Sequence, residues 1–235
     1  MNKHYAFYSP FKMKDSKGNE YTLTVEQDDY AEDPREWDNL CTMICWHHDY
    51  SLGDKHKYDD SDEFMNYILH KVCGMEYEDF EELPTREKYK LICESDKVYI
   101  KKINLYDHSG ITVSTSENYP YNDRWDSSRV GFIYVTKERV LKEIANADEV
   151  NWTAIADEYI EDEMETYDDY LRGNVYSWTL IKKVVKQDKC PHCGEVIREY
   201  EDEEEVDSCG GYYGNCLEEN GILSDMDNDL EFVED

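Results

Sequence analysis

The alternation of apolar and polar side chains predicts several β-strands along the chain. Tyr21–Glu26 alternates Tyr, Leu and Val with Thr and Glu, which is the pattern of a strand with one buried face. Val130–Val135 is apolar on both faces, so we expect a central strand covered by helices. The other expected strands are rich in β-branched and aromatic residues, namely Val98–Tyr106, Gly110–Thr115, Val175–Lys186 and a shorter Val196–Tyr200.

Apolar residues at helical spacing predict helices between these strands. Phe64, Ile68 and Val72 recur along one face of one such helix, and Ser61 is expected to cap it. The expected helices are Glu36–Cys45, Ser61–Cys73, a helix capped by Thr136 that ends near Asn146, and a longer acidic helix over Trp152–Leu171.

The mixed order of strands and helices predicts an α+β fold with a largely antiparallel sheet flanked by helices. We expect an α+β core at residues 1–186, which includes the acidic helix at 152–171. A Cys-containing acidic segment, with a hairpin pinned by zinc, is expected at 187–235.

Composition indicates a folded chain, because disordered acidic chains are poor in aromatic residues and this one has 21 Tyr and 5 Trp among 235 residues. The sequence shows neither a basic-then-apolar leader nor a long apolar run, so we expect a cytoplasmic protein without a membrane span. The formal net charge of −31 would repel nucleic acid and anionic lipid.

The negative charge is concentrated in two stretches that contain neither Lys nor Arg. Residues 143–171 carry 11 acidic side chains and residues 199–235 carry 15, which together supply −26 of the −31. A field concentrated in this way favours a partner of opposite charge and can raise association rates by roughly 10 to 1,000-fold at low salt.

Within the expected helix Trp152–Leu171, apolar residues form one stripe and carboxylates take the opposite side. Carboxylates on a rigid helix can present a basic groove with a target similar to the phosphates of nucleic acid. The alternative is a solvated face that only keeps the protein soluble. The residues expected to bind the partner are Asp157, Glu158, Glu161, Asp162, Glu165, Asp168 and Asp169.

Four cysteines near the C-terminus indicate a structural zinc site. Cys190 and Cys193 have the two-residue gap of a zinc knuckle, and Cys209 and Cys216 follow at gaps of 15 and six residues. The last gap departs from the usual four-Cys pattern, and reduced, partly buried thiols are the alternative. His192 is a poorer ligand candidate. A second set of residues is better explained by buried Cys and hydrogen-bonded His, namely Cys41, Cys45, His47, His48, His70 and Cys73.

Signs of catalysis are weak. The common nucleotide-binding, zinc-protease and hydrolase motifs do not occur. Asp107-His108-Ser109 places an acid, a base and a hydroxyl together, but side chains adjacent in sequence usually diverge, so this segment is expected to be a turn.

Six stretches of the chain carry a family resemblance, namely Trp37–Leu40, Ser51–His56, Tyr106–Gly110, Val130–Val135, Asp207–Cys209 and Tyr213-Gly214. They resemble an uncharacterised family of acidic proteins encoded by phages and integrative elements of Gram-positive bacteria. The resemblance spans most of residues 35–145. It implies a mobile-element setting, but it supplies neither an activity nor a zinc site that can be carried over. In charge alone, the chain also resembles DNA-mimic inhibitors of restriction or CRISPR systems.

We therefore expect a phage or mobile-element inhibitor, not an enzyme, that occupies the basic nucleic-acid groove of a host defence nuclease (an anti-CRISPR or antirestriction protein). Glu201–Glu205 is expected to form a second acidic surface. The first alternative is a zinc-stabilised protein–protein adaptor without nucleic-acid mimicry. The second alternative is an enzyme centred on His108.

Overall fold

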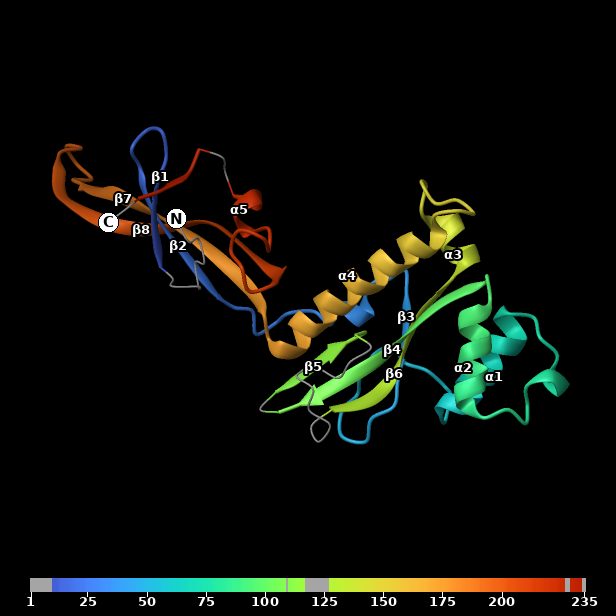
Figure 1. Cartoon of the computed structure of the whole chain (residues 1–235). Helices are drawn as coiled ribbons and strands as arrows, with labels where there is room; N and C mark the ends of the chain where they lie inside the picture. The colour runs from blue at the N-terminus through green and yellow to red at the C-terminus, as the bar shows by residue number, and fades with distance from the viewer. Residues whose placement is uncertain (1–9, 109, 117–126, 227–228, 234–235) are drawn as a thin grey trace. The chain divides into compact units, whose positions relative to one another are not determined.

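The computed structural model describes residues 10–108, 110–116, 127–226 and 229–233 (Figure 1). The fold is α+β, as expected, with antiparallel strand pairing throughout its two sheets. The chain divides into unit 1, residues 1–32 with 173–235, and unit 2, residues 33–172. The domain boundary expected after residue 186 is wrong, because residue 186 lies inside the strand Val175–Lys189. The first and last strands of the chain are neighbours in one sheet, so both ends of the chain belong to unit 1.

Unit 2 is built on a four-stranded sheet in the order β3-β6-β4-β5. The strand predicted at Val130–Val135 is central, as expected, and is buried on both faces. One hydrophobic cluster lies on each side of the sheet. The strands are β3 (Thr42–Cys45), β4 (Val98–Asp107), β5 (Ile111–Ser114) and β6 (Ser127–Thr136).

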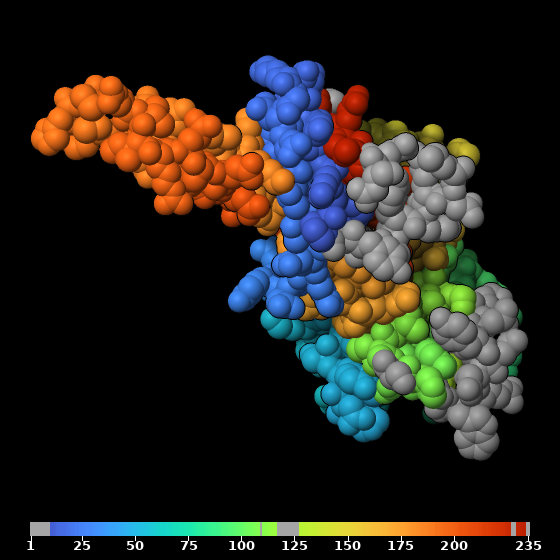
Figure 2. Space-filling view, turned by 90° about the vertical axis from the view of Figure 1, so that its left-hand side faces the viewer, coloured from blue at the N-terminus to red at the C-terminus, as the bar shows by residue number. Residues whose placement is uncertain are grey.

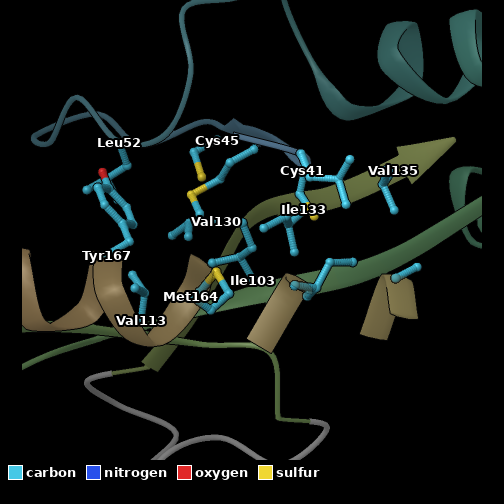
Figure 3. Packing of buried hydrophobic residues seen from close by; sticks show 14 of the residues in the cluster. Cys41, Cys45, Leu52, Ile103, Val113, Val130, Ile133, Val135, Met164 and Tyr167 are labelled. Carbon is cyan, nitrogen blue, oxygen red and sulfur yellow. The ribbon is translucent and has the colours of Figure 1, made fainter. Parts of the chain in front are cut away.

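Helices cover both faces of this sheet (Figure 1). On one face, Met164 and Tyr167 of α4 pack with Ile103 and Ile133 of the sheet (Figure 3). On the other face, α1 and α2 pack over the second cluster. The helical elements are η1 (Pro34–Glu36), α1 (Ser61–Tyr67), its π-helical continuation η2 (Ile68–Val72), η3 (Tyr77–Asp79), α2 (Thr85–Glu94), α3 (Lys137–Glu143) and α4 (Trp152–Arg172).

Two local predictions for unit 2 are wrong. The expected helix Glu36–Cys45 is a 3₁₀ turn followed by β3, because β-branched Thr42 and Ile44 suit a short buried strand that periodicity alone does not separate from a helix. The helix that begins at Ser61 is capped by Asp60, whose carboxylate accepts the N–H groups of Asp62 and Glu63, both at 2.9 Å. Thr136 caps α3 as predicted.

Unit 1 is a five-stranded sheet in the order β8-β7-β2-β1-β9. Its core gathers Leu23, Trp178 and Leu180 of the sheet with Leu217 and Ile222. The elements are β1 (Phe11–Lys14), β2 (Glu20–Gln27), β7 (Val175–Lys189), β8 (Val196–Tyr213), α5 (Ile222–Asp225) and β9 (Glu231–Phe232).

The β7–β8 hairpin is much longer than predicted. The expected short strand Val196–Tyr200 continues to Tyr213. β2 pairs with β7 only from Tyr176 to Lys182. Beyond Lys182 the hairpin continues as a two-stranded ribbon, which extends past β1 and β2 in Figure 2.

Candidate partner-binding surface and cysteine turn

The acidic helix forms as predicted, and the structure divides its seven predicted residues into two sets. The inner group faces β4 and β5 and consists of Asp157, Glu161 and Asp168. The outer row recurs at steps of four, three and four residues along α4, next to the inner group and further from the core, and it consists of Glu158, Asp162, Glu165 and Asp169.

The inner group attaches α4 to the edge of the sheet. Lys101 of β4 forms ion pairs with both Asp157 and Glu161, the latter at 2.6 Å. The Tyr99 hydroxyl donates to Asp157 at 2.9 Å. The Lys101 ammonium is the main reason that the pKa of Asp157 lies below its ordinary value. These two carboxylates therefore stabilise the packing of the helix on β4.

Asp168 makes the corresponding contact with β5. Its carboxylate accepts the backbone N–H of Val113 at 2.8 Å and the hydroxyl of Thr112. Arg172 lies 3.5 Å away, one helical turn further along α4. The carboxylate is largely covered, so Asp168 anchors the sheet edge and is not part of an open acidic face.

Most of the outer row is open to solvent. Glu158, Asp162 and Glu165 are exposed, and Asp169 is half-buried. Within the described chain, no Lys or Arg forms an ion pair with Glu158, Asp162 or Glu165. Steps of three and four residues on a helix keep these side chains on one face, about 5–6 Å apart between Cβ atoms.

Glu163 is an acid of α4 that the sequence reasoning left out. It lies on the apolar side of the helix, where its carboxylate accepts from the Arg35 guanidinium at 2.8 Å and from the Cys41 N–H at 2.9 Å. Arg35 also forms an ion pair with Asp54 at 2.8 Å. Burial opposes the charge on Arg35, but the hydrogen bonds to Asp54 and Glu163 outweigh it and raise the pKa of the guanidinium. An acid at an apolar helix position was the available signal for this buried cluster.

The second predicted acidic surface, Glu201–Glu205, lies on β8 and alternates between the two faces of the ribbon. Lys186 on β7 pairs with Asp202 at 2.6 Å and with Glu204 at 3.1 Å. The side chains of Glu201, Glu203 and Glu205 take the opposite face. Charge on this segment is thus partly balanced by its own hairpin.

The four-cysteine zinc site is not assembled. Trp178 pairs with Cys209, whereas Lys189 pairs with Val196 next to the turn that holds Cys190 and Cys193. Eleven strand residues at about 3.3 Å each separate these positions by roughly 36 Å. One ion therefore does not reach both Cys209 and the Cys190/Cys193 pair within one chain. Cys216 follows β8, whose last residue Tyr213 pairs with Val175 at the end of the hairpin away from the turn.

Cys190 and Cys193 do come together, in the cysteine turn (Cys190–Gly194) that closes the β7–β8 hairpin. The Cys190 N–H donates to the Glu195 carbonyl at 2.7 Å, and the Gly194 N–H donates to the Cys190 carbonyl at 2.9 Å. The backbone N–H groups of Cys193 and His192 lower the pKa of the Cys190 thiol, and the Cys193 side chain adds to this effect.

The remaining histidine and cysteine candidates described below are buried or already hydrogen-bonded. Burial raises the pKa of Cys45 to about 12, and that of Cys41 is raised for the same leading reason. His47, His48 and Asp49 lie close together on a loop. However, His47 Nδ1 already accepts the N–H of Asp49 at 3.2 Å. His48 pairs with Asp49 at 2.8 Å.

Asp107 and His108 lie at the β4–β5 connection, and Ser109 falls outside the described residues. Asp107 accepts a hydrogen bond from the Tyr50 hydroxyl at 2.9 Å. A hollow of about 1060 Å³ lies along β4, and its lining includes Lys101 and Lys102 together with Glu161 and Glu165. Its described lining includes no His, and burial raises the pKa of its one cysteine, Cys93.

Comparison with protein-family models, with curated proteins and with solved structures gives no match to this chain. In the described parts of the chain, none of the helices combines the length and the apolar character needed to cross a lipid bilayer.

Proposed function

We propose that the protein is an inhibitor that presents the outer row of α4 to the basic nucleic-acid groove of another protein, and that this partner is a bacterial defence nuclease of the CRISPR or restriction type. Inhibition is by occupation of the groove, without turnover. The observation that carries the proposal is the outer row itself: exposed carboxylates on one face of a packed helix, three of them without a described cationic partner.

The rigidity of α4 supports this proposal. Lys101 holds the helix to β4, Asp168 holds it to β5, and Arg35 holds Glu163 on its buried side. A partner would therefore meet carboxylates already in place, and the entropy lost on ordering them at the interface is small.

The spacing of the row is compatible with a groove that reads phosphates. From Glu158 to Asp169 the helix rises about 16 Å, which gives one carboxylate per roughly 5.5 Å. A DNA strand carries one phosphate per about 3.4 Å of axis. The row has the sign of a phosphate backbone and somewhat lower charge density.

The row also has a cost in the free protein that a basic partner would remove. Like charges three or four residues apart on a helix destabilise by about 0.2–0.5 kcal/mol for each pair. Glu158 with Asp162, Asp162 with Glu165, and Glu165 with Asp169 are three such pairs. Burial against Lys and Arg converts this repulsion into attraction, which favours the complex.

The test begins with capture of partners from a bacterial lysate on the immobilised full-length chain. Screening shortens the Debye length from about 10 Å at 0.1 M salt to about 3 Å at 1 M. We expect a nuclease to be retained at the lower salt and lost at the higher. Duplex DNA should displace this partner, because both would occupy the same groove.

The triple variant E158K/D162K/E165K should abolish capture. The matched control is E78K/E81K/E82K, which makes the same change in charge at exposed positions elsewhere in unit 2. Capture that survives the first variant, or that is lost equally with the control, would overturn the proposal. Retention of the partner in 1 M salt would favour an adaptor that binds through apolar contacts instead.

A further inference from the structure

The cysteine turn carries two thiols with the two-residue gap of a zinc knuckle. Cys190 and Cys193 lie at the end of the ribbon and are separated by about 36 Å of strand from Cys209. In the described chain, no three His, Cys, Asp or Glu ligand atoms that include both sulfurs lie within 4.8 Å of one another. A closed structural zinc site has four ligands, so the turn supplies two and lacks two.

The backbone of the turn is compact and keeps both cysteines at its tip. Gly194 adopts a φ of +76°, which turns the chain back into β8. The Cys190 N–H donates to the Glu195 carbonyl at 2.7 Å, and the Gly194 N–H donates to the Cys190 carbonyl at 2.9 Å.

The surroundings of the turn suit a second copy of the same chain. Residues 186–199 carry three basic and three acidic side chains, so this end of the ribbon is neutral in a chain of net charge −31. Val196 and Ile197, directly after the turn, are 50% and 69% exposed. Two copies of the chain therefore meet little local charge repulsion at this end of the ribbon, and each offers exposed apolar side chains that the other can cover.

We propose that two copies of the protein join end to end at their cysteine turns and share one zinc ion. Cys190 and Cys193 of each copy supply the four thiolates, with Zn–S distances of about 2.3 Å. Four thiols lose their protons to solvent as one Zn²⁺ binds, and no electron is transferred. The inference is independent of the proposed function, since its residues belong to unit 1 and the outer row belongs to unit 2.

The experiment uses the full-length chain, reduced with a phosphine that does not bind metal and freed of metal with a chelator. Zinc is then titrated while the mass in solution is measured by light scattering. We expect the mass to double from 28.0 kDa, to reach its limit at one zinc for two chains, and to return on chelation. Cobalt in place of zinc should give the absorption spectrum of a tetrahedral four-thiolate centre.

Two cysteine variants test whether the turn alone holds the shared zinc. C190S/C193S should remain a single chain at every zinc concentration, with an unchanged circular dichroism spectrum because the turn is at the surface. C209S/C216S should dimerise as the unmodified protein does. The proposal is overturned by one zinc bound per undimerised chain, by doubling without zinc, or by loss of doubling in C209S/C216S.

Discussion

The Arg35 guanidinium donates to the Glu163 carboxylate at 2.8 Å, between a 3₁₀ turn at the start of unit 2 and the buried side of α4. Asp54 completes the cluster. The structure thus uses one acid of α4 to fix the helix from beneath, while the outer row remains at the surface.

Removal of Arg35 should be strongly destabilising. Arg35→Ala leaves the carboxylates of Glu163 and Asp54 without their cation, and breaking a buried pair in this way costs about 3–5 kcal/mol. Urea unfolding followed by far-ultraviolet circular dichroism reports on the helices, which lie mostly in unit 2. Lys55→Ala is the control, because the Lys55–Glu36 pair is at the surface and should contribute about 0–1 kcal/mol. Equal effects of the two substitutions would contradict the importance of the buried cluster.

Neutralising the outer row should stabilise the free protein. E158Q/D162N/E165Q removes the three like-charge pairs within the outer row, and these pairs alone predict a gain of about 0.6–1.5 kcal/mol at low ionic strength. The gain should shrink in 1 M salt, where the Debye length is about 3 Å. The same urea experiment at two salt concentrations checks this. A loss of stability at low salt would mean that these carboxylates hold the fold together.

We expect Asp15 to titrate with a pKa of about 2. NMR of its side-chain carboxyl as a function of pH would check this value. The Asn19 side chain donates to this carboxylate at 2.6 Å and is the largest cause of the shift. The pKa of Asp15 in the folded protein lies below the ordinary value of 3.8. The hydrogen bonds to the Asp15 carboxylate therefore stabilise the fold above pH 3.8, and this stabilisation is lost as the pH falls toward 2. Asn19→Ala should move the pKa of Asp15 upward, and an unchanged value would show that Asn19 is not the cause.

Thiol modification should follow the order of burial and pKa. Without metal, Cys190 should react with iodoacetamide faster than Cys93, whose pKa is raised by burial. Cys41 and Cys45 should stay unmodified until the protein unfolds. Mass spectrometry of peptides over a time course measures each rate. Early labelling of Cys41 would contradict its placement in the core.

The extent of α4 could be predicted because its apolar residues recur at helical spacing over the whole segment. The division of its acids into an inner group and an outer row could not be predicted. It depends on contacts with Lys101 and Thr112, which are remote from α4 in the sequence. Glu163 is the exception, because its position on the apolar side of α4 can be read from the sequence alone.

The long strand β8 was missed because charged residues are depleted in strands. In β8, part of the negative charge is balanced by Lys186 on the neighbouring strand, which forms ion pairs with Asp202 and Glu204. The four-cysteine prediction failed for a related reason. Spacing along the chain does not give the register of a hairpin, and the register places Cys209 far from the turn.

Unit 2 is inserted in sequence between β2 and β7, which are hydrogen-bonded neighbours in the sheet of unit 1. During synthesis, β2 leaves the ribosome about 150 residues before its partner strand, so the sheet of unit 1 is completed only after all of unit 2 has been made. The inserted unit can fold in that interval, whereas β2 must wait for β7 to be made.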